Sequence, residues 1–222
     1  MIIVFDLDDT LYEEISFVRS GYMAVAHYLE KKHGLSYEKS FSFMIEHALK
    51  FGRQFVFNKL LDKHKLNIKK NVNSCLSIYR QHKPTIALYP DAQACFLSLK
   101  NYPIYIVTDG NKNVQRNKLK ALGLFDKAKF CFITHRYGRQ NSKPSPYCFL
   151  KICAKEMAKP QEVIYIADNP TKDFVGIKPL GFKTVRILQG PYKNVRLNEQ
   201  FEAEHIIHSL KELNLNFLNQ LK

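Results

Sequence analysis

The sequence predicts an α/β protein in which a doubly wound parallel sheet carries an all-helical domain inserted after its first strand. After residue 85, short apolar runs alternate with segments of helical periodicity, and the runs lack the polar alternation of a half-exposed strand. Such runs are typical of parallel strands that helices cover on both faces. Residues 13–85 show helical periodicity without a strand-like run. We therefore expect an α/β core from residues 1–12 and 86–222 and a helical domain from residues 13–85.

The expected strands of the core are short and strongly apolar. They are the runs at 2–5, 103–107, 130–134, 163–167 and 183–188. Core helices are expected at 91–100, 112–121, 145–157 and 172–179, with one or two more at 199–221. In the helical domain, Val18, Tyr22, Val25 and Leu29 recur at intervals of three or four residues, which predicts a helix from about 12 to 32. Two or three further helices are expected between 40 and 83, before the break at Pro84.

The chain is strongly basic, with 34 Lys and Arg against 20 Asp and Glu and a formal net charge of +14. A basic excess of this size raises the hypothesis of a nucleic-acid partner. The charge is uneven, because residues 50–83 hold nine basic side chains and one acidic, and residues 110–160 hold twelve and two. Residues 1–49 instead hold eight acidic and four basic side chains. This distribution favours the attraction of small anions to an acidic site over the binding of a polyanion.

Neither a membrane span nor a disulfide framework is expected. No run of about 18 apolar residues occurs, which excludes a transmembrane helix. Residues 1–10 lack the basic start and long apolar stretch of a secretory signal, so we expect a cytoplasmic protein with no membrane partner. The five cysteines are odd in number and form no CxxC pair, so we expect them to be buried apolar residues.

Side chains suited to catalysis occur at or after the ends of four expected strands. They are Asp6 and Asp8 after the first strand, Thr108 and Asp109 after the second, Lys143 after the third, and Asp168 and Asp173 after the fourth. The carboxyl ends of parallel strands form one edge of a sheet, and ligands of open α/β proteins bind at that edge. We therefore expect these side chains to form one site.

The residue types at this edge indicate phosphate chemistry assisted by a divalent cation. Asp6 and Asp8 can supply a nucleophile or metal ligand and a proton donor and acceptor. The Thr108 hydroxyl, together with backbone N–H groups at a helix start, makes an anion site. The Lys143 ammonium can neutralise a phosphoryl oxygen. The oxygen ligands that begin with Asp168 suit a hard cation such as Mg²⁺.

Four segments, FDLDDTL, VTDG, SKPSPYCF and IADNPTKDF, resemble in that order the motifs of the haloacid dehalogenase-like (HAD) superfamily. The resemblance covers essentially the whole chain, including the strand before each motif and the helical insertion after the first. It implies a Rossmannoid core, a helical cap that closes over the cleft and supplies specificity, and Mg²⁺-dependent hydrolysis of a phosphomonoester. The implied partner is a small phosphorylated metabolite, namely a sugar phosphate or a nucleotide.

The resemblance also implies roles for the residues of the first two motifs. Asp6 would be the nucleophile that forms an aspartyl-phosphate, and it would also bind Mg²⁺. Asp8 would protonate the leaving oxygen and then activate water, while its backbone carbonyl binds the metal. Thr108 would hold the phosphoryl oxygens with the backbone N–H of Asp109.

For the last two motifs, the resemblance makes Lys143 the residue that balances the charge of Asp6 and the phosphoryl group. It makes Asp168 a ligand of Mg²⁺ and Asp173 a supporting residue that orients Lys143 or metal-bound water. Two positions depart from the family pattern, since Ala167 replaces the usual glycine and Asp109 stands where asparagine or serine is commoner. The role of the Asp109 carboxylate is left open.

Asp8 favours a phosphatase within the superfamily, because a departing halide needs no proton and the dehalogenases of the superfamily lack this aspartate. A phosphosugar mutase or another phosphotransferase shares the four motifs and stays open as an alternative. A basic nucleic-acid-binding protein on the same scaffold is the lesser alternative, because the carboxylates would repel a polyanion. The sequence does not determine the oligomeric state, and both a monomer and a dimer are open.

Overall fold

The computed structural model describes residues 1–221 and divides the chain into two compact units. Unit 1 comprises Met1–Glu14 together with the chain from Ala87 onward, and unit 2 comprises Ile15–Ile86. All five cysteines are free and buried, as the sequence predicts. Within residues 1–221, no helix combines the length and apolar character that crossing a bilayer requires.

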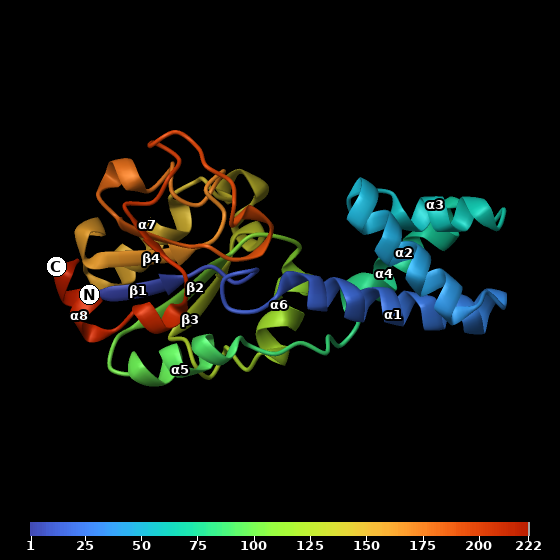
Figure 1. Ribbon diagram of the computed structural model, residues 1–222, viewed down its shortest axis with the longest axis horizontal. Helices are drawn as coiled ribbons and strands as arrows, with labels where there is room; N and C mark the ends of the chain where they lie inside the picture. The colour runs from blue at the N-terminus through green and yellow to red at the C-terminus, as the bar shows by residue number, and fades with distance from the viewer. Residues whose placement is uncertain (222) are drawn as a thin grey trace. The chain divides into compact units, whose positions relative to one another are not determined.

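Unit 1 is built on a six-stranded parallel sheet with the order β3-β2-β1-β4-β5-β6 (Figure 1). The strands are β1 (Ile2–Phe5), β2 (Ile104–Thr108), β3 (Phe130–Ile133), β4 (Val163–Ala167), β5 (Lys183–Ile187) and β6 (His205–Ile207). In the register of the sheet, Ile3 of β1 pairs with Ile104 of β2 on one side and with Ile164 of β4 on the other. The strand order reverses at β1, so the carboxyl end of β1 lies at the topological switch point. The predicted doubly wound sheet is confirmed.

Helices cover both faces of this sheet. In the described part of unit 1 they are α5 (Pro90–Ser98), α6 (Lys112–Ala121), α7 (Tyr147–Glu156) and α8 (Leu215–Gln220). Successive residues of a strand point to opposite faces. Val4 therefore joins a buried cluster with Phe149 of α7, whereas Phe5 packs on Phe96 of α5 with ring centroids 5.7 Å apart. The two-sided burial explains why β1, β2, β3 and β4 read as nearly continuous apolar runs.

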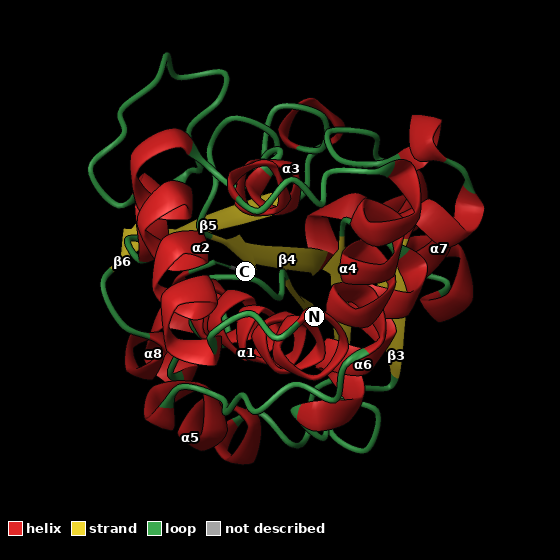
Figure 2. Ribbon diagram, turned by 90° about the vertical axis from the view of Figure 1, so that its right-hand side faces the viewer, coloured by secondary structure: helices red, strands yellow, loops and turns green. Residues whose placement is uncertain are grey.

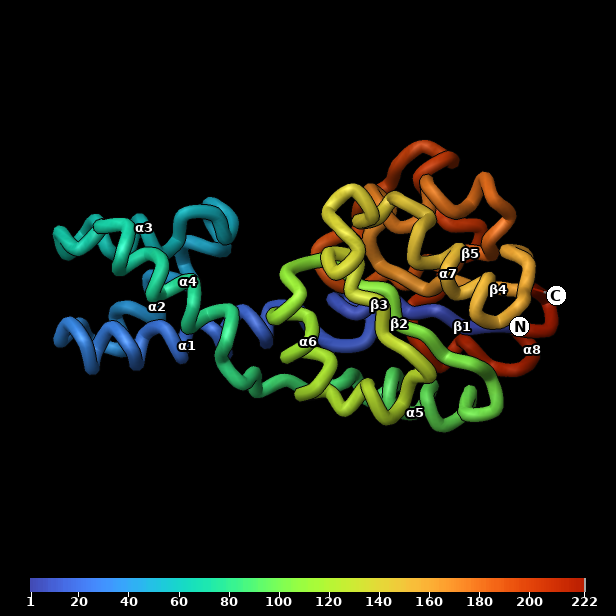
Figure 3. Tube along the Cα trace, turned by 180° about the vertical axis from the view of Figure 1, so that it is seen from behind, coloured from blue at the N-terminus to red at the C-terminus, as the bar shows by residue number. Residues whose placement is uncertain are grey.

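Unit 2 is all-helical, as the sequence predicts (Figure 3). Its helices are α1 (Glu14–His33), α2 (Tyr37–Phe51), α3 (Val56–Lys63) and α4 (Lys69–Gln81). The apolar stripe of α1, which includes Val18 and Tyr22, is buried in one cluster with residues of the other three helices. Gly21 allows α4 to pack closely here, since a Cβ at this position would lie 2.5 Å from ring atoms of Tyr79.

Two expectations for the last third of the chain were wrong. The expected helix at 172–179 is a series of turns that ends in a 3-10 turn at Lys178–Leu180. Pro179 has no N–H and disfavours helix at the residue before it, so a regular helix cannot continue through this segment. The expected helices at 199–221 reduce to α8, and residues 205–207 instead pair with β5 as the edge strand β6 (Figure 2). A three-residue strand is too short for periodicity to reveal.

Gly176 is the point at which the segment after β4 touches the loop after β3. A Cβ built on Gly176 would lie 1.7 Å from the carbonyl oxygen of Pro144. We predict that Gly176→Ala lowers the free energy of unfolding by about 3 kcal/mol, because a backbone contact cannot yield as a side chain can. Urea unfolding followed by circular dichroism measures this value.

The matched control for this substitution is Gly123→Ala. Gly123 has a φ of +62° and open space around it, so an added Cβ causes backbone strain without a clash. We expect a loss of about 1 kcal/mol in the control. Equal losses in the two variants would contradict the proposed contact between the two segments.

Candidate active site

The residues predicted to form the site all lie toward the carboxyl edge of the parallel sheet. Asp6 and Asp8 follow β1, Thr108 ends β2 and Asp109 follows it, Lys143 lies between β3 and α7, and Asp168 and Asp173 follow β4. The Asp6 N–H donates to the carbonyl of Ile166 at 2.9 Å, which continues the ladder between β1 and β4 by one residue. This bond fixes Asp6 on the rim of the sheet between its two neighbouring strands.

Lys143 is the positive centre of the site. Its Nζ donates to Asp6 Oδ1 at 2.7 Å and to the Tyr165 hydroxyl at 3.0 Å, and it forms an ion pair with Asp173 Oδ1 at 2.7 Å. Burial by itself would lower the pKa of this lysine. The carboxylates of Asp173 and Asp6 outweigh burial and hold the pKa of Lys143 well above its usual value. The lysine is therefore charged between its two carboxylate partners.

Asp6 is buried beside this ammonium. Burial raises the pKa of Asp6 to about 6, an effect that Lys143 opposes and Asp173 reinforces. Asp173 is fully engaged, since Oδ1 also accepts from the Tyr165 hydroxyl at 3.1 Å and Oδ2 accepts from the Asn169 N–H at 3.1 Å. Asp173 therefore positions Lys143, while Asp6 contacts Lys143 through one carboxylate oxygen.

Asp8 lies among hydrogen-bond donors. Its Oδ1 accepts from Lys118 Nζ at 2.6 Å and from the Tyr12 hydroxyl at 2.5 Å, and its Oδ2 accepts from Gln115 Nε2 at 2.9 Å. Burial would raise the pKa of Asp8, but the charge of Lys118 and these hydrogen bonds hold it below the usual value. The Gln115 amide also donates to the Thr108 hydroxyl at 2.5 Å, which links the first two motifs.

The Asp109 carboxylate holds the loop that carries Lys143. Its Oδ1 accepts from the Thr134 hydroxyl at 2.6 Å and from the Lys143 backbone N–H at 3.2 Å, and Lys172 Nζ lies 3.5 Å from Oδ2. Burial would raise the pKa of Asp109, but Lys143 and the other donors lower it. The side chain thus serves the architecture of the loop, which the sequence had left open.

Asp6, Asp168 and Asp173 form an acidic cluster in which one carboxylate oxygen of each lies within 4.8 Å of the others. Asp168 is 4% exposed. Burial, followed by the charges of Asp6 and Asp173, raises the pKa of Asp168 to about 9. An adjacent cation would reverse this effect and stabilise the anion. The cluster therefore fits a hard divalent cation held by Asp6 and Asp168, because both oxygens of Asp173 are already bound.

Two residues of α6 that hold Asp8 were not predicted from the sequence. Gln115 and Lys118 lie three positions apart on one face of the helix, and both are buried. The signal in the sequence was that Gln115 and Lys118 lie on the same side of the helix as the apolar Leu119, which is the buried side. A buried lysine requires a carboxylate partner, but only the fold identifies that partner as Asp8.

Arg186 of β5 was missed as well. Its side chain is fully buried and donates through Nη1 to both oxygens of Glu202, at 2.9 and 2.7 Å. Nη2 donates to the carbonyls of Tyr192 and Val195, and Nε donates to the carbonyl of Asp168 at 3.3 Å. Arg186 therefore ties the segment before β6 to the backbone of the acidic cluster. The signal was an arginine between Val185 and Ile187 in an expected strand.

The sheet order and the site together define a hydrolase of the haloacid dehalogenase type. The chain belongs to the haloacid dehalogenase-like hydrolase family, whose model matches residues 1–181. This match spans all four motifs and confirms the resemblance noted in the sequence.

Curated relatives of similar length are phosphatases by name. The chain is 28% identical to the glyceraldehyde 3-phosphate phosphatase of Pyrococcus furiosus, over 96% of this chain and 90% of the relative. It is also 28% identical to the enzyme of that name from Methanocaldococcus jannaschii, over 95% and 94%. Among solved structures, a HAD phosphatase from Thermococcus onnurineus superposes with a TM-score of 0.60 at 25% identity, covering 96% of this chain and 95% of the other.

The Arg186 network generates a prediction about stability. We expect Arg186→Met to lower the free energy of unfolding by about 3 kcal/mol, because Glu202 then keeps its charge without its partner. The Glu202 side chain is only 16% exposed, so water cannot fully replace the guanidinium. Adding Glu202→Gln should recover about 1 kcal/mol of this loss. Urea unfolding of both single variants and the double variant tests the coupling, and strictly additive losses would contradict it.

Proposed function

We propose that this protein is a Mg²⁺-dependent phosphatase that hydrolyses a small phosphomonoester through an aspartyl-phosphate on Asp6. The observation that carries the proposal is the Lys143 ammonium between Asp6 and Asp173, next to the buried carboxylate of Asp168. An anionic nucleophile can approach an anionic phosphate only where positive charge offsets their repulsion. The phosphatase names of the full-length relatives support hydrolysis over phosphoryl transfer to a second substrate.

In the first step, a carboxylate oxygen of Asp6 attacks the phosphorus atom of the substrate. The bond between phosphorus and the leaving oxygen breaks as the bond to Asp6 forms, and Asp8 gives a proton to the leaving oxygen. Asp8 must be protonated for this step, although Lys118 favours its ionised form by lowering its pKa. A bound phosphate places further negative charge beside Asp8 and raises its pKa, which supplies the proton when substrate is present.

In the second step, water attacks the phosphorus atom of the aspartyl-phosphate. Asp8 accepts a proton from this water, and its hydrogen bond from Lys118 at 2.6 Å favours the ionised form that a base requires. The bond between phosphorus and Asp6 then breaks, which releases inorganic phosphate. The proton on Asp8 is available for the next cycle.

The residues proposed to hold Mg²⁺ are Asp6 and Asp168 through their carboxylates and Asp8 through its backbone carbonyl. The Asp8 carboxylate is bound to Tyr12, Gln115 and Lys118, so its side chain serves proton transfer instead. A bound Mg²⁺ supplies positive charge to the phosphoryl oxygens. Lys143 and the Thr108 hydroxyl are proposed to hold the remaining phosphoryl oxygens.

The proposed substrate is a small sugar phosphate, in accord with the glyceraldehyde 3-phosphate named for two relatives. A relative from Thermus thermophilus, 31% identical over 46% of this chain, is named a phosphoserine phosphatase. Both named substrates are three-carbon phosphomonoesters, which favours a small substrate over a nucleotide. Residues 13–85 are proposed to act as the cap that selects this substrate.

The nucleophile is tested with Asp6→Asn. We expect phosphate release from glyceraldehyde 3-phosphate and p-nitrophenyl phosphate to fall by about a thousandfold or more, because an amide cannot form the acyl phosphate. Asp126→Asn, at an exposed residue, is the matched control and should retain full activity. Acid quenching should trap ³²P on the parent protein and none on the Asp6→Asn variant, which gives a second readout. Turnover retained in Asp6→Asn would rule out this mechanism.

The metal site is tested by thermal unfolding in buffer treated with EDTA and then supplied with MgCl₂. Mg²⁺ should raise the melting temperature of the parent protein, because a ligand that binds the native state stabilises it. Asp168→Asn should abolish this shift while melting at or above the metal-free parent at neutral pH, since it removes a buried carboxyl whose raised pKa makes it take up a proton on folding. An equal Mg²⁺ shift in parent and variant would place the metal elsewhere.

A further inference from the structure

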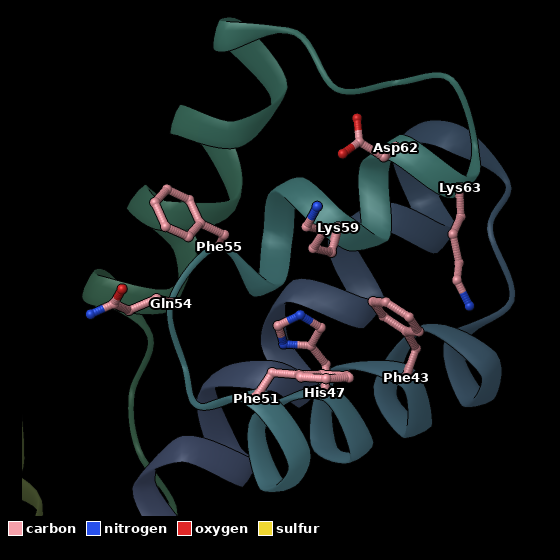
Figure 4. Close-up of a pocket in the computed structure, with 8 residues that line it drawn as sticks. All are labelled: Phe43, His47, Phe51, Gln54, Phe55, Lys59, Asp62 and Lys63. Carbon is pink, nitrogen blue, oxygen red and sulfur yellow. The ribbon is translucent and has the colours of Figure 1, made fainter.

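Unit 2 contains a cavity of about 590 Å³ between α2 and α3 (Figure 4). It is lined by Phe43, His47 and Phe51 of α2, by Gln54 and Phe55 of the connection, and by Lys59, Asp62 and Lys63 of α3. Its volume lies in the range of sites for small molecules. Every lining residue belongs to unit 2, so the cavity shares no residue with the acidic site of unit 1.

One wall of the cavity is a row of aromatic rings. Phe43, His47 and Phe51 are spaced four residues apart and therefore lie on one face of α2. The ring centroids are 5.9 Å apart for Phe43 and His47 and 5.3 Å apart for His47 and Phe51. Figure 4 shows the imidazole of His47 between the two phenylalanine side chains. Phe51 is 66% exposed and Phe55 is 69% exposed, and aromatic side chains left exposed together around a cavity mark a binding site.

The surroundings of the aromatic wall are basic. Lys59 and Lys63 line the cavity, and Lys63 Nζ lies 4.2 Å from the ring centroid of Phe43. Lys50 Nζ lies 5.1 Å from the ring centroid of Phe51. The one acidic lining residue, Asp62, accepts a hydrogen bond from Asn67 Nδ2 at 2.7 Å. The cavity therefore presents a positive potential to an entering ligand.

We propose that this cavity binds a nucleoside monophosphate. The base stacks on the exposed ring of Phe51 in the aromatic wall, and the phosphate pairs with Lys59. The volume of the cavity fits one nucleotide, whereas a polynucleotide requires an extended track of rings. The cavity shares no residue with the acidic site proposed for hydrolysis, so the two proposals can fail separately.

The test is calorimetric titration of AMP into the full-length Asp6→Asn protein, which prevents hydrolysis of the ligand. Phe51→Ser and Lys59→Gln, both at exposed positions, should each weaken binding of AMP by about tenfold or more. The matched controls are Leu49→Ser and Lys31→Gln, which change the same residue class outside the cavity and should alter affinity by less than about twofold. Adenosine, which lacks the phosphate, should bind at least about tenfold more weakly than AMP.

Three results would overturn the proposal. The first is that the Phe51→Ser, Lys59→Gln double variant binds AMP with the same affinity and stoichiometry as the protein without these two substitutions. This result would place AMP at the acidic site. The second is tighter, salt-sensitive binding of a single-stranded oligonucleotide that AMP does not displace. The third is binding of phosphatidylserine vesicles through the same residues without competition by AMP.

Discussion

The buried bridge from Asp6 through Lys143 to Asp173 is the interaction on which the rest of the site depends. It joins the end of β1, the loop after β3 and the turn after β4, and Asp6 and Lys143 are 137 positions apart in the sequence. A buried cluster of ion pairs is stable only when every charged partner is present, because each charge has lost its hydration. Tyr165 and the Asn169 backbone complete the hydrogen bonds of this group, and the close contact at Gly176 keeps its two loops together.

The site separates its carboxyl groups into two electrostatic environments. Asp8 is surrounded by donors from Tyr12, Gln115 and Lys118, and its pKa is lowered. Asp168 has carboxylates as its neighbours, and its pKa is raised to about 9. When two carboxyl groups lie in environments that shift their pKa values in opposite directions, they can serve different functions in one site. The hydrogen-bond donors around Asp8 suit proton transfer, and the carboxylates around Asp168 suit the binding of a cation.

The net charge of +14 has a different meaning once the fold is known. The acidic cluster lies in unit 1, whereas one of the two basic blocks, residues 50–83, lies in unit 2. In that block, Lys59 and Lys63 line a cavity with an aromatic wall, so part of the basic excess surrounds a site of small-molecule size. A small anionic ligand accounts for such a concave site better than a polyanion does.

The fold class, the central strands and the motifs that directly follow β1, β2 and β4 could be predicted from the sequence, because local apolar runs and the residues at their ends are visible in a single segment. Only the tertiary structure revealed Gln115 and Lys118 as the partners of Asp8, and Arg186 as the support of Asp168, because those contacts join residues far apart in the chain. The edge strand β6 and the turns at 172–179 were also decided by tertiary context. A three-residue strand has little local preference, and its pairing with β5 supplies the hydrogen bonds that define it.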